Sequence, residues 1–123
     1  MAVAIVGASE TTELGRIPDL SQLQLHADAA LNAMADAKIK PSDIDGVATA
    51  GASPTEIAHY LGIEPHWADG TSVGGCSFML HVRHAVAAIE AGHCSTVLIT
   101  HGESGRSGVG RGGFFGGGGG ASL

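Results

Sequence analysis

Aromatic residues are scarce in this 123-residue chain, where they make up 4% of the composition and include one Trp and one Tyr. Large aromatic side chains supply much of the buried area of most protein cores. A core built from Ala, Val, Leu and Gly instead is typical of helices packed closely on a sheet, or of burial shared with a partner. The length allows one domain with one modest core.

Basic charge is also sparse, with six Lys and Arg residues against twelve Asp and Glu residues and a net charge of −6. The absence of any basic cluster argues against a nucleic-acid partner. Nothing in the charge pattern favours a membrane surface, and no stretch approaches the roughly 20 apolar residues of a membrane span. Two cysteines are too few for a disulfide framework. The first nine residues do not read as a signal peptide, so we expect a cytoplasmic protein.

Apolar, partly β-branched runs predict the strands. Residues 2–6, which end at Gly7, predict a buried strand, and residues 47–50 and 96–100 predict two more. Residues 66–68 are a candidate for a short fourth strand. Residues 10–19 contain loop signals and lack an apolar period, so we expect a loop there.

Three helices are predicted between these strands. The first begins after Ser21 and ends before Pro41, with an apolar stripe of Leu23, Ala27, Ala30, Leu31 and Met34. The second begins with the Ser53-Pro54-Thr55-Glu56 capping pattern and stops near Gly62. The third runs from about residue 76 to 91, with a predicted buried stripe of Phe78, Val82, Ala85 and Ile89.

The alternation of strands and helices predicts an α/β layered fold with a largely parallel sheet over residues 1–104. The composition then changes, because ten of the residues from Gly105 to Gly120 are glycine. We expect residues 105–123 to form a flexible loop or tail. Three or so strands are few for a parallel sheet covered on both faces, so we expect a fragment, or a chain completed by a partner.

The loop from Thr71 to Ser77 is the segment with the clearest chemical potential. Cys76 stands at the predicted start of a helix, where the helix dipole and free N–H groups favour a thiolate. Gly74 and Gly75 would let a bulky acyl thioester approach the backbone, and the same N–H groups could stabilise an oxyanion. The alternative is that Cys76 is a small buried apolar residue.

Three motifs together resemble the N-terminal signature of the thiolase superfamily: residues 74–77, residues 85–92 and residues 97–104. In that family a reactive cysteine starts a buried helix, and a strand follows that carries a Gly-x-Glu-Ser turn. Glu103 and Ser104 match that turn, whereas His101 stands at its glycine. Residues 4–7 and 44–47 resemble the sterol-carrier-protein-type branch. The resemblance implies the N-terminal half-domain of a thiolase-like layered fold, with a partial mixed or parallel sheet and covering helices.

The resemblance also contains a departure that concerns the nucleophile. Counting back by the family's spacing from Gly92, and from Glu103, reaches Gly75 rather than Cys76. Divergent members of this branch lack the usual nucleophile, and some resemble retro-aldolases that act on steroid side chains. Cys76 is nevertheless the best single candidate for a catalytic residue. The family's other catalytic groups, a histidine and a second cysteine, lie in its C-terminal half, so no base is assigned here.

The resemblance implies an enzyme that acts on CoA thioesters, either a thiolase-type acyltransferase of the acetyl-CoA acetyltransferase kind or a carbon–carbon bond-cleaving relative. CoA would enter with the substrate, and no other cofactor is expected. The alternative is a non-catalytic subunit or scaffold. In either case the expected partners are a second copy, a thiolase-like chain or an OB-fold acyl-CoA-binding protein.

The remaining candidates favour structural roles. His81 and His84 lie about one helical turn apart, a spacing that could suit a metal, but no cysteine pair accompanies them and we predict core or solvated histidines and no metal site. Glu103 is expected to tie down a turn, with shaping of the active site as the alternative. Cys94 is expected in the core. The glycines of residues 108–113 lack the strand–turn–helix context of a nucleotide-binding loop.

Overall fold

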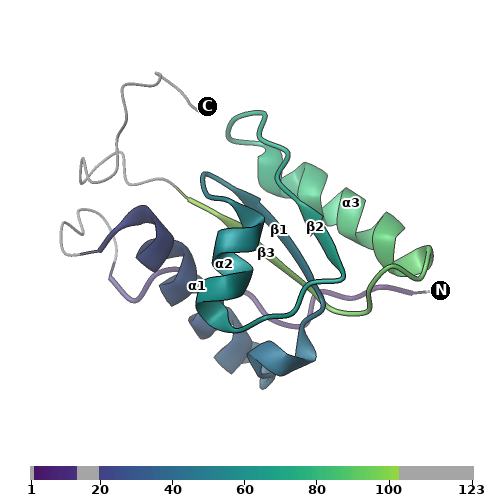
Figure 1. The fold of residues 1–123 in the computed structure, drawn as a ribbon, viewed down its shortest axis with the longest axis horizontal. Coiled ribbons are helices and arrows are strands. Elements are labelled where there is room, and N and C mark those ends of the chain that lie inside the picture. Colours follow the sequence, from purple (N-terminus) through teal and green to yellow (C-terminus); the bar gives the residue numbers. More distant parts are fainter. Residues whose placement is uncertain (1, 14–19, 103–123) are drawn as a thin grey trace.

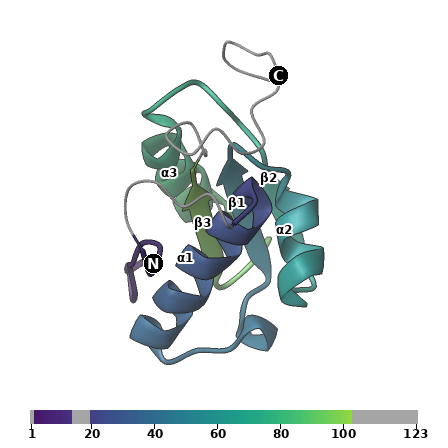
Figure 2. The same cartoon turned by 90° about the vertical axis from the view of Figure 1, so that its left-hand side faces the viewer.

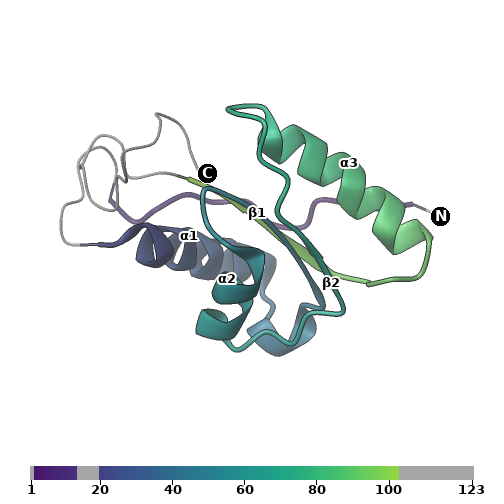
Figure 3. The same cartoon turned by 45° about the horizontal axis from the view of Figure 1, so that its top comes forward.

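The computed structural model describes residues 2–13 and 20–102. They form three layers, with a small sheet between two layers of helices (Figure 1). The elements in chain order are α1 (Gln22–Ala37), a short 3-10 turn (Pro41–Asp43), β1 (Gly46–Ala50), α2 (Pro54–Leu61), β2 (Trp67–Asp69), α3 (Ser77–Glu90) and β3 (Val97–His101). The strands are parallel in the order β2-β1-β3. Helices α1 and α2 cover one face of the sheet and α3 covers the other (Figures 2 and 3). The predicted α/β layered fold is confirmed.

Local capping signals place the starts of α1 and α2 and the end of α2 where the sequence predicts them, whereas α1 already ends at Ala37, before Pro41. Ser21 and Gln24 form a reciprocal capping box at the start of α1. Ser53 accepts a hydrogen bond from the Glu56 N–H at the start of α2, which ends at Gly62 in the left-handed conformation. These bonds satisfy backbone groups that a helix leaves unpaired, so helix boundaries are fixed by contacts between residues close in the sequence.

The core lies between the sheet and the helices α1 and α2. All five residues of β1 are buried, because β1 is flanked by strands on both sides and covered on both faces. Most of the predicted α1 stripe is also buried or packed on the core, whereas Leu31 is half exposed, contrary to prediction. The main cluster consists of Ala30, Met34, Ile44, Val47, Ile57, Ala58, Ile63 and Leu98.

The predicted first strand does not form in the described part of the chain. Residues 2–6 are irregular, and the Ile5 and Val6 side chains are largely exposed. The segment that follows is held by α1, since the Ala8 N–H donates to Asp36 at 3.0 Å and the Thr12 N–H donates to Asp28 at 2.7 Å. A strand needs a neighbouring edge to pair with, and these contacts with α1 leave a gap between residues 2–6 and β3.

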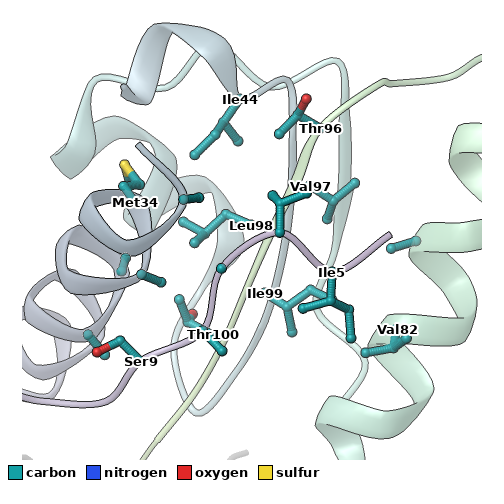
Figure 4. Close-up of a pocket in the computed structure, with 18 of the residues that line it drawn as sticks. Ile5, Ser9, Met34, Ile44, Val82, Thr96, Val97, Leu98, Ile99 and Thr100 are labelled. Atoms are coloured by element: carbon teal, nitrogen blue, oxygen red, sulfur yellow. The ribbon is translucent and has the colours of Figure 1, made fainter. Parts of the chain in front are cut away.

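That gap is an apolar groove of about 1020 Å³, lined by residues 2–11 and by parts of α1, α3 and β3. Figure 4 places Ile5 of the N-terminal segment near Ile99 of β3 and Val82 of α3. The groove also explains why the predicted buried stripe of α3 is partly wrong. Phe78 and Val82 were expected in the buried stripe of α3, but they are 48% and 36% exposed and face the groove. The buried residues of α3 are Ser77, His81, Ala85 and Ala88.

Candidate functional site

The carboxyl ends of the three strands define one edge of the sheet. Parallel strands end on the same side, so the segments after Ala50, Asp69 and His101 share this edge with the first turns of the helices that follow β1 and β2. Ligands of open α/β sheets bind outside the carboxyl ends of the strands. We therefore take this edge, and the loop that leads into α3, as the candidate site.

The segment from Gly70 to Cys76, here called the α3 entry loop, connects β2 to α3. Its Thr71 donates twice to Asp69 Oδ1, from the backbone N–H at 2.9 Å and from the hydroxyl at 2.6 Å. At the other end, the buried Ser77 hydroxyl donates to Gly74 O at 2.7 Å and accepts from the Val73 N–H at 2.9 Å. Residues 72–76 are exposed, so hydrogen bonds rather than apolar burial hold the loop.

Cys76 is the N-cap residue, immediately before the first turn of α3, and its side chain is exposed. Its sulfur makes one long contact, 4.0 Å, with Val73 O. The prediction that Cys76 precedes the helix is confirmed, and the alternative of a small buried residue is wrong. Its catalytic role stays a prediction.

Gly75, the rival position for the nucleophile, also faces open space. A Cβ atom built on Gly75 would meet no atom within 4 Å. The N–H groups of Gly75, Cys76 and Phe78 donate to no acceptor among residues 2–13 and 20–102. The start of α3 therefore presents free donors and open space to a ligand, together with the positive end of the helix dipole.

Cys94 has the opposite surroundings. It is buried before β3, where a Cβ atom at Gly46 would lie 3.2 Å from its sulfur. Burial raises the pKa of the Cys94 thiol, and the nearby Asp45 carboxylate raises it further. The prediction that Cys94 belongs to the core is confirmed.

His26 is a buried polar residue at this edge that the sequence analysis did not single out. Its Nε2–H donates to Gly102 O at 2.9 Å, so its Nδ1 accepts from the Thr100 hydroxyl at 2.7 Å. Burial lowers the pKa of His26 more than the hydrogen bond to Gly102 raises it, and the neighbouring His101 adds to the decrease. A neutral imidazole thus links α1 to the end of β3. Gln22, one turn earlier on α1, donates to the carbonyls of Gly51 and Gly102. The polar pair Gln22 and His26, four residues apart on one face of α1, is the sequence signal that could have indicated this site.

The two α3 histidines have separate partners. His81 is fully buried and its Nε2–H donates to Thr71 O at 2.8 Å, whereas His84 Nδ1 lies 2.6 Å from Asp69 Oδ2. His81 is therefore a core histidine, as predicted. Its Nδ1 has no hydrogen-bond partner within the part of the chain that the structure describes. Partial burial would by itself raise the pKa of Asp69, but hydrogen bonds from Thr71 and His84 outweigh this and lower the pKa to about 2.

His101 ends β3 and stacks on Phe78 of α3, with ring centroids 6.2 Å apart. Its ring thus meets the first turn of α3 at the candidate site. The predictions for Glu103, Ser104 and the glycine-rich residues 105–123 lie outside the described residues. None of the described helices is long and apolar enough to cross a membrane.

Comparison with protein families finds no matching family model. Solved structures do match, and they define the class of fold. The chain superposes with a TM-score of 0.67 on a monomeric SCP2-thiolase-like protein type 1 from Mycobacterium smegmatis, at 30% identity over 80% of this chain and 23% of that one. It therefore has the fold of the N-terminal part of a thiolase-superfamily protein, and the resemblance seen in the sequence is confirmed.

Two relatives that match in sequence are named as an aldolase and a lyase. A steroid side-chain-cleaving aldolase from Thermomonospora curvata is 35% identical over 88% of this chain, and a 17-hydroxy-3-oxo-4-pregnene-20-carboxyl-CoA lyase from Mycobacterium tuberculosis is 34% identical over 86%. A solved structure of an Ltp2–ChsH2(DUF35) aldolase matches with a TM-score of 0.68 and 31% identity, over 86% of this chain and 30% of that one. The chain spans 28% of the length of these two curated relatives.

Proposed function

We propose that this chain contributes the N-terminal part of a carbon–carbon bond-cleaving lyase that acts on a CoA thioester by a retro-aldol reaction. The observation that carries the proposal is the similarity to two proteins named as an aldolase and a CoA lyase, which extends over 86–88% of the chain. The name of the mycobacterial relative describes a substrate with a hydroxyl group and a CoA thioester. We expect a hydroxyacyl-CoA of this general kind.

The proposed reaction needs a base and an oxyanion site. The base removes the proton of the β-hydroxyl group, the oxygen becomes a ketone, and the Cα–Cβ bond breaks. The bonding electrons pass into the thioester, which becomes an enolate and then takes up a proton to give a shorter acyl-CoA. CoA enters as part of the substrate, and the step requires no redox cofactor.

The start of α3 suits the oxyanion part of this reaction. The N–H groups of residues 75, 76 and 78, which have no acceptor within the described part of the chain, and the helix dipole favour a negative charge at that point. A carbonyl oxygen that acquires enolate charge would be stabilised there, whereas the ground-state carbonyl would gain less. In this proposal Cys76 supplies a backbone N–H, and its thiol is not needed.

A second candidate is thiolase-type acyl transfer with Cys76 as the nucleophile. The exposed position of the thiol at the N-terminal end of α3 favours it, because that setting promotes the thiolate form. The third candidate is a subunit that binds the thioester without reacting. The relatives named as lyases make the aldolase our first choice.

We also propose a protein partner. The name of the solved aldolase joins two components, Ltp2 and ChsH2(DUF35). By analogy, we expect this chain to work with a second component, either an OB-fold acyl-CoA-binding protein or another thiolase-like chain, or with a second copy of itself.

Mass spectrometry with two substrates separates these candidates. The purified chain, alone and with its partner, would be incubated with a β-hydroxyacyl-CoA bearing a tertiary alcohol and, separately, with a simple acyl-CoA. Release of a ketone and a shorter acyl-CoA by both the wild-type chain and C76A supports the aldolase. Acylation of Cys76, abolished in C76A but kept in M79A at the neighbouring exposed Met79, supports acyl transfer instead. Binding without either product supports the non-catalytic subunit.

A further inference from the structure

The α3 entry loop carries the candidate site but has almost no apolar support. Three of its seven residues are glycine, and Gly74 adopts a φ of 93°. Residues 72–76 are all exposed. Glycine-rich, exposed backbone loses much conformational freedom when it is ordered. A single arrangement of this loop therefore depends on the hydrogen bonds at its ends.

The first half of the loop is bound by side chains of α3. His84 donates from Nδ1 to Asp69 Oδ2 at 2.6 Å, and Asp69 Oδ1 accepts both the N–H and the hydroxyl of Thr71. His81, one turn earlier on α3, donates to Thr71 O at 2.8 Å. Every polar group of Thr71 is thus engaged. Its two partners are Asp69 at the end of β2 and His81 on α3, and Asp69 is itself bound by His84 of α3.

Among these hydrogen bonds, the one between Asp69 and His84 is the least constrained by packing. His81 is fully buried, and its ring is fixed by packing. His84 has a side chain that is 42% exposed, and only its bond to Asp69 orients it among the described residues. Asp69 keeps its negative charge because three donors surround it, and hydrogen bonds to charged groups are the stronger kind.

We infer that Asp69 and His84 form a positioning pair that fixes the α3 entry loop and, through it, the backbone N–H groups and thiol at the start of α3. Neither residue is assigned a contact with the substrate. The catalytic significance of the pair rests on the proposed function, but the loop-fixing role does not. An active-site group displaced by about 1 Å can lose a factor of about 100 in rate, so the control of a glycine-rich loop would matter for any reaction there.

The test compares a variant that removes the donor with one that restores it. H84F keeps a ring but cannot donate, whereas H84N places an amide N–H near the former Nδ1. H59N is the control, because His59 lies on the exposed side of α2 with no side-chain hydrogen bond in the described residues. The measurements are the amide hydrogen exchange of Thr71 and Val73, whose N–H groups donate to Asp69 and to Ser77, and the alkylation rate of Cys76 in the 123-residue chain.

Loss of one hydrogen bond to a charged group should accelerate exchange in the loop about tenfold in H84F. We also expect a changed Cys76 alkylation rate in H84F, and recovery of both values in H84N. Equal behaviour of H84F, H84N and H59N would overturn the inference. T71V removes only the 2.6 Å hydroxyl bond and should show a smaller effect of the same kind, which keeps the test valid if H84F unfolds. No substrate is used, so this result stands apart from that of the lyase assay.

Discussion

At the scale of single residues, the two cysteines differ in exposure and in electrostatic surroundings. Cys76 is exposed at the start of α3. Cys94 is buried, and both its burial and the Asp45 carboxylate raise the pKa of its thiol. A thiolate is the reactive form of cysteine, so these surroundings should translate directly into different rates of reaction.

We predict that iodoacetamide modifies Cys76 at least about tenfold faster than Cys94 at neutral pH. Peptide mass spectrometry after timed quenching measures both rates in one sample. C76A should leave the thermal unfolding midpoint unchanged, because the side chain contacts little. Equal rates for the two thiols in the folded chain would contradict the exposure described here.

Asp69 gives a prediction about acid stability. Its folded-state pKa is about 2, below the ordinary value of 3.8. A lowered carboxyl pKa means that the folded state is stabilised above pH 3.8, and that this stabilisation is lost as the pH falls from about 4 to about 2. D69N cannot titrate, so its free energy of unfolding should depend less steeply on pH in that window.

Urea titrations of the wild-type chain and D69N between pH 2 and pH 5 provide the measurement. D43N is a suitable control, because Asp43 lies at the other end of the sheet in the 3-10 turn. If D69N and the wild-type chain lose stability in parallel, then Asp69 is not the group that titrates.

At the scale of elements, the rotation of α3 is the clearest departure from expectation. Its apolar residues Phe78 and Val82 face the groove, while Ser77 and His81 are buried against the rest of the molecule. The buried polar pair is satisfied mainly by the entry loop, through bonds to Gly74 O, Val73 N and Thr71 O. The orientation of α3 thus follows from polar contacts that helical periodicity does not report.

A pair of substitutions tests this orientation. Ala88 is 5% exposed and lies outside the predicted stripe, so A88N would bury an amide without a partner and should cost about 2–4 kcal/mol of stability. Val82 is 36% exposed, so V82N should cost less than about 1 kcal/mol. Chemical denaturation of both variants measures the difference. A larger loss for V82N than for A88N would mean that α3 packs through the stripe predicted from the sequence.

At the scale of the whole molecule, the sheet has an open side. In the described residues β3 pairs only with β1, and its other edge borders the apolar groove with the exposed residues Ile5 and Val6 across from it. Unpaired strand edges and exposed apolar surface both promote association between chains. Burial shared with a partner, one of the two expectations from the aromatic-poor composition, therefore stays a prediction.

We therefore predict that the 123-residue chain self-associates at micromolar concentration. Sedimentation velocity over a range of concentrations measures the association, and I5K, which puts a charge beside the groove, should weaken it. L31K is the control, since Leu31 is half exposed on α1 and is not among the residues that line the groove. A monodisperse monomer with a cooperative thermal transition would disprove the prediction.

The sequence by itself determined the features that depend on neighbours within one or two turns. The starts of α1 and α2 and the end of α2 follow from Ser21, Ser53 and Gly62, because a capping bond joins residues a few positions apart. The strand and helix order follows from local apolar runs. The loop before α3, with Cys76 at its end, could also be read from the sequence, since the resemblance to thiolase-superfamily proteins rests on short motifs.

Only the tertiary structure decided which of these elements pair and which faces they bury. Residues 2–6 have the composition of a strand, but a strand forms only where an edge is within hydrogen-bonding reach, and here α1 holds the adjoining residues. The buried histidines find hydrogen-bond partners only in the folded chain. His26 is bound by Thr100 and Gly102, which are distant in the sequence, and His81 by Thr71 of the loop that folds back on α3. Such contacts are long-range, so their energy cannot be read from the local pattern that places a helix or strand.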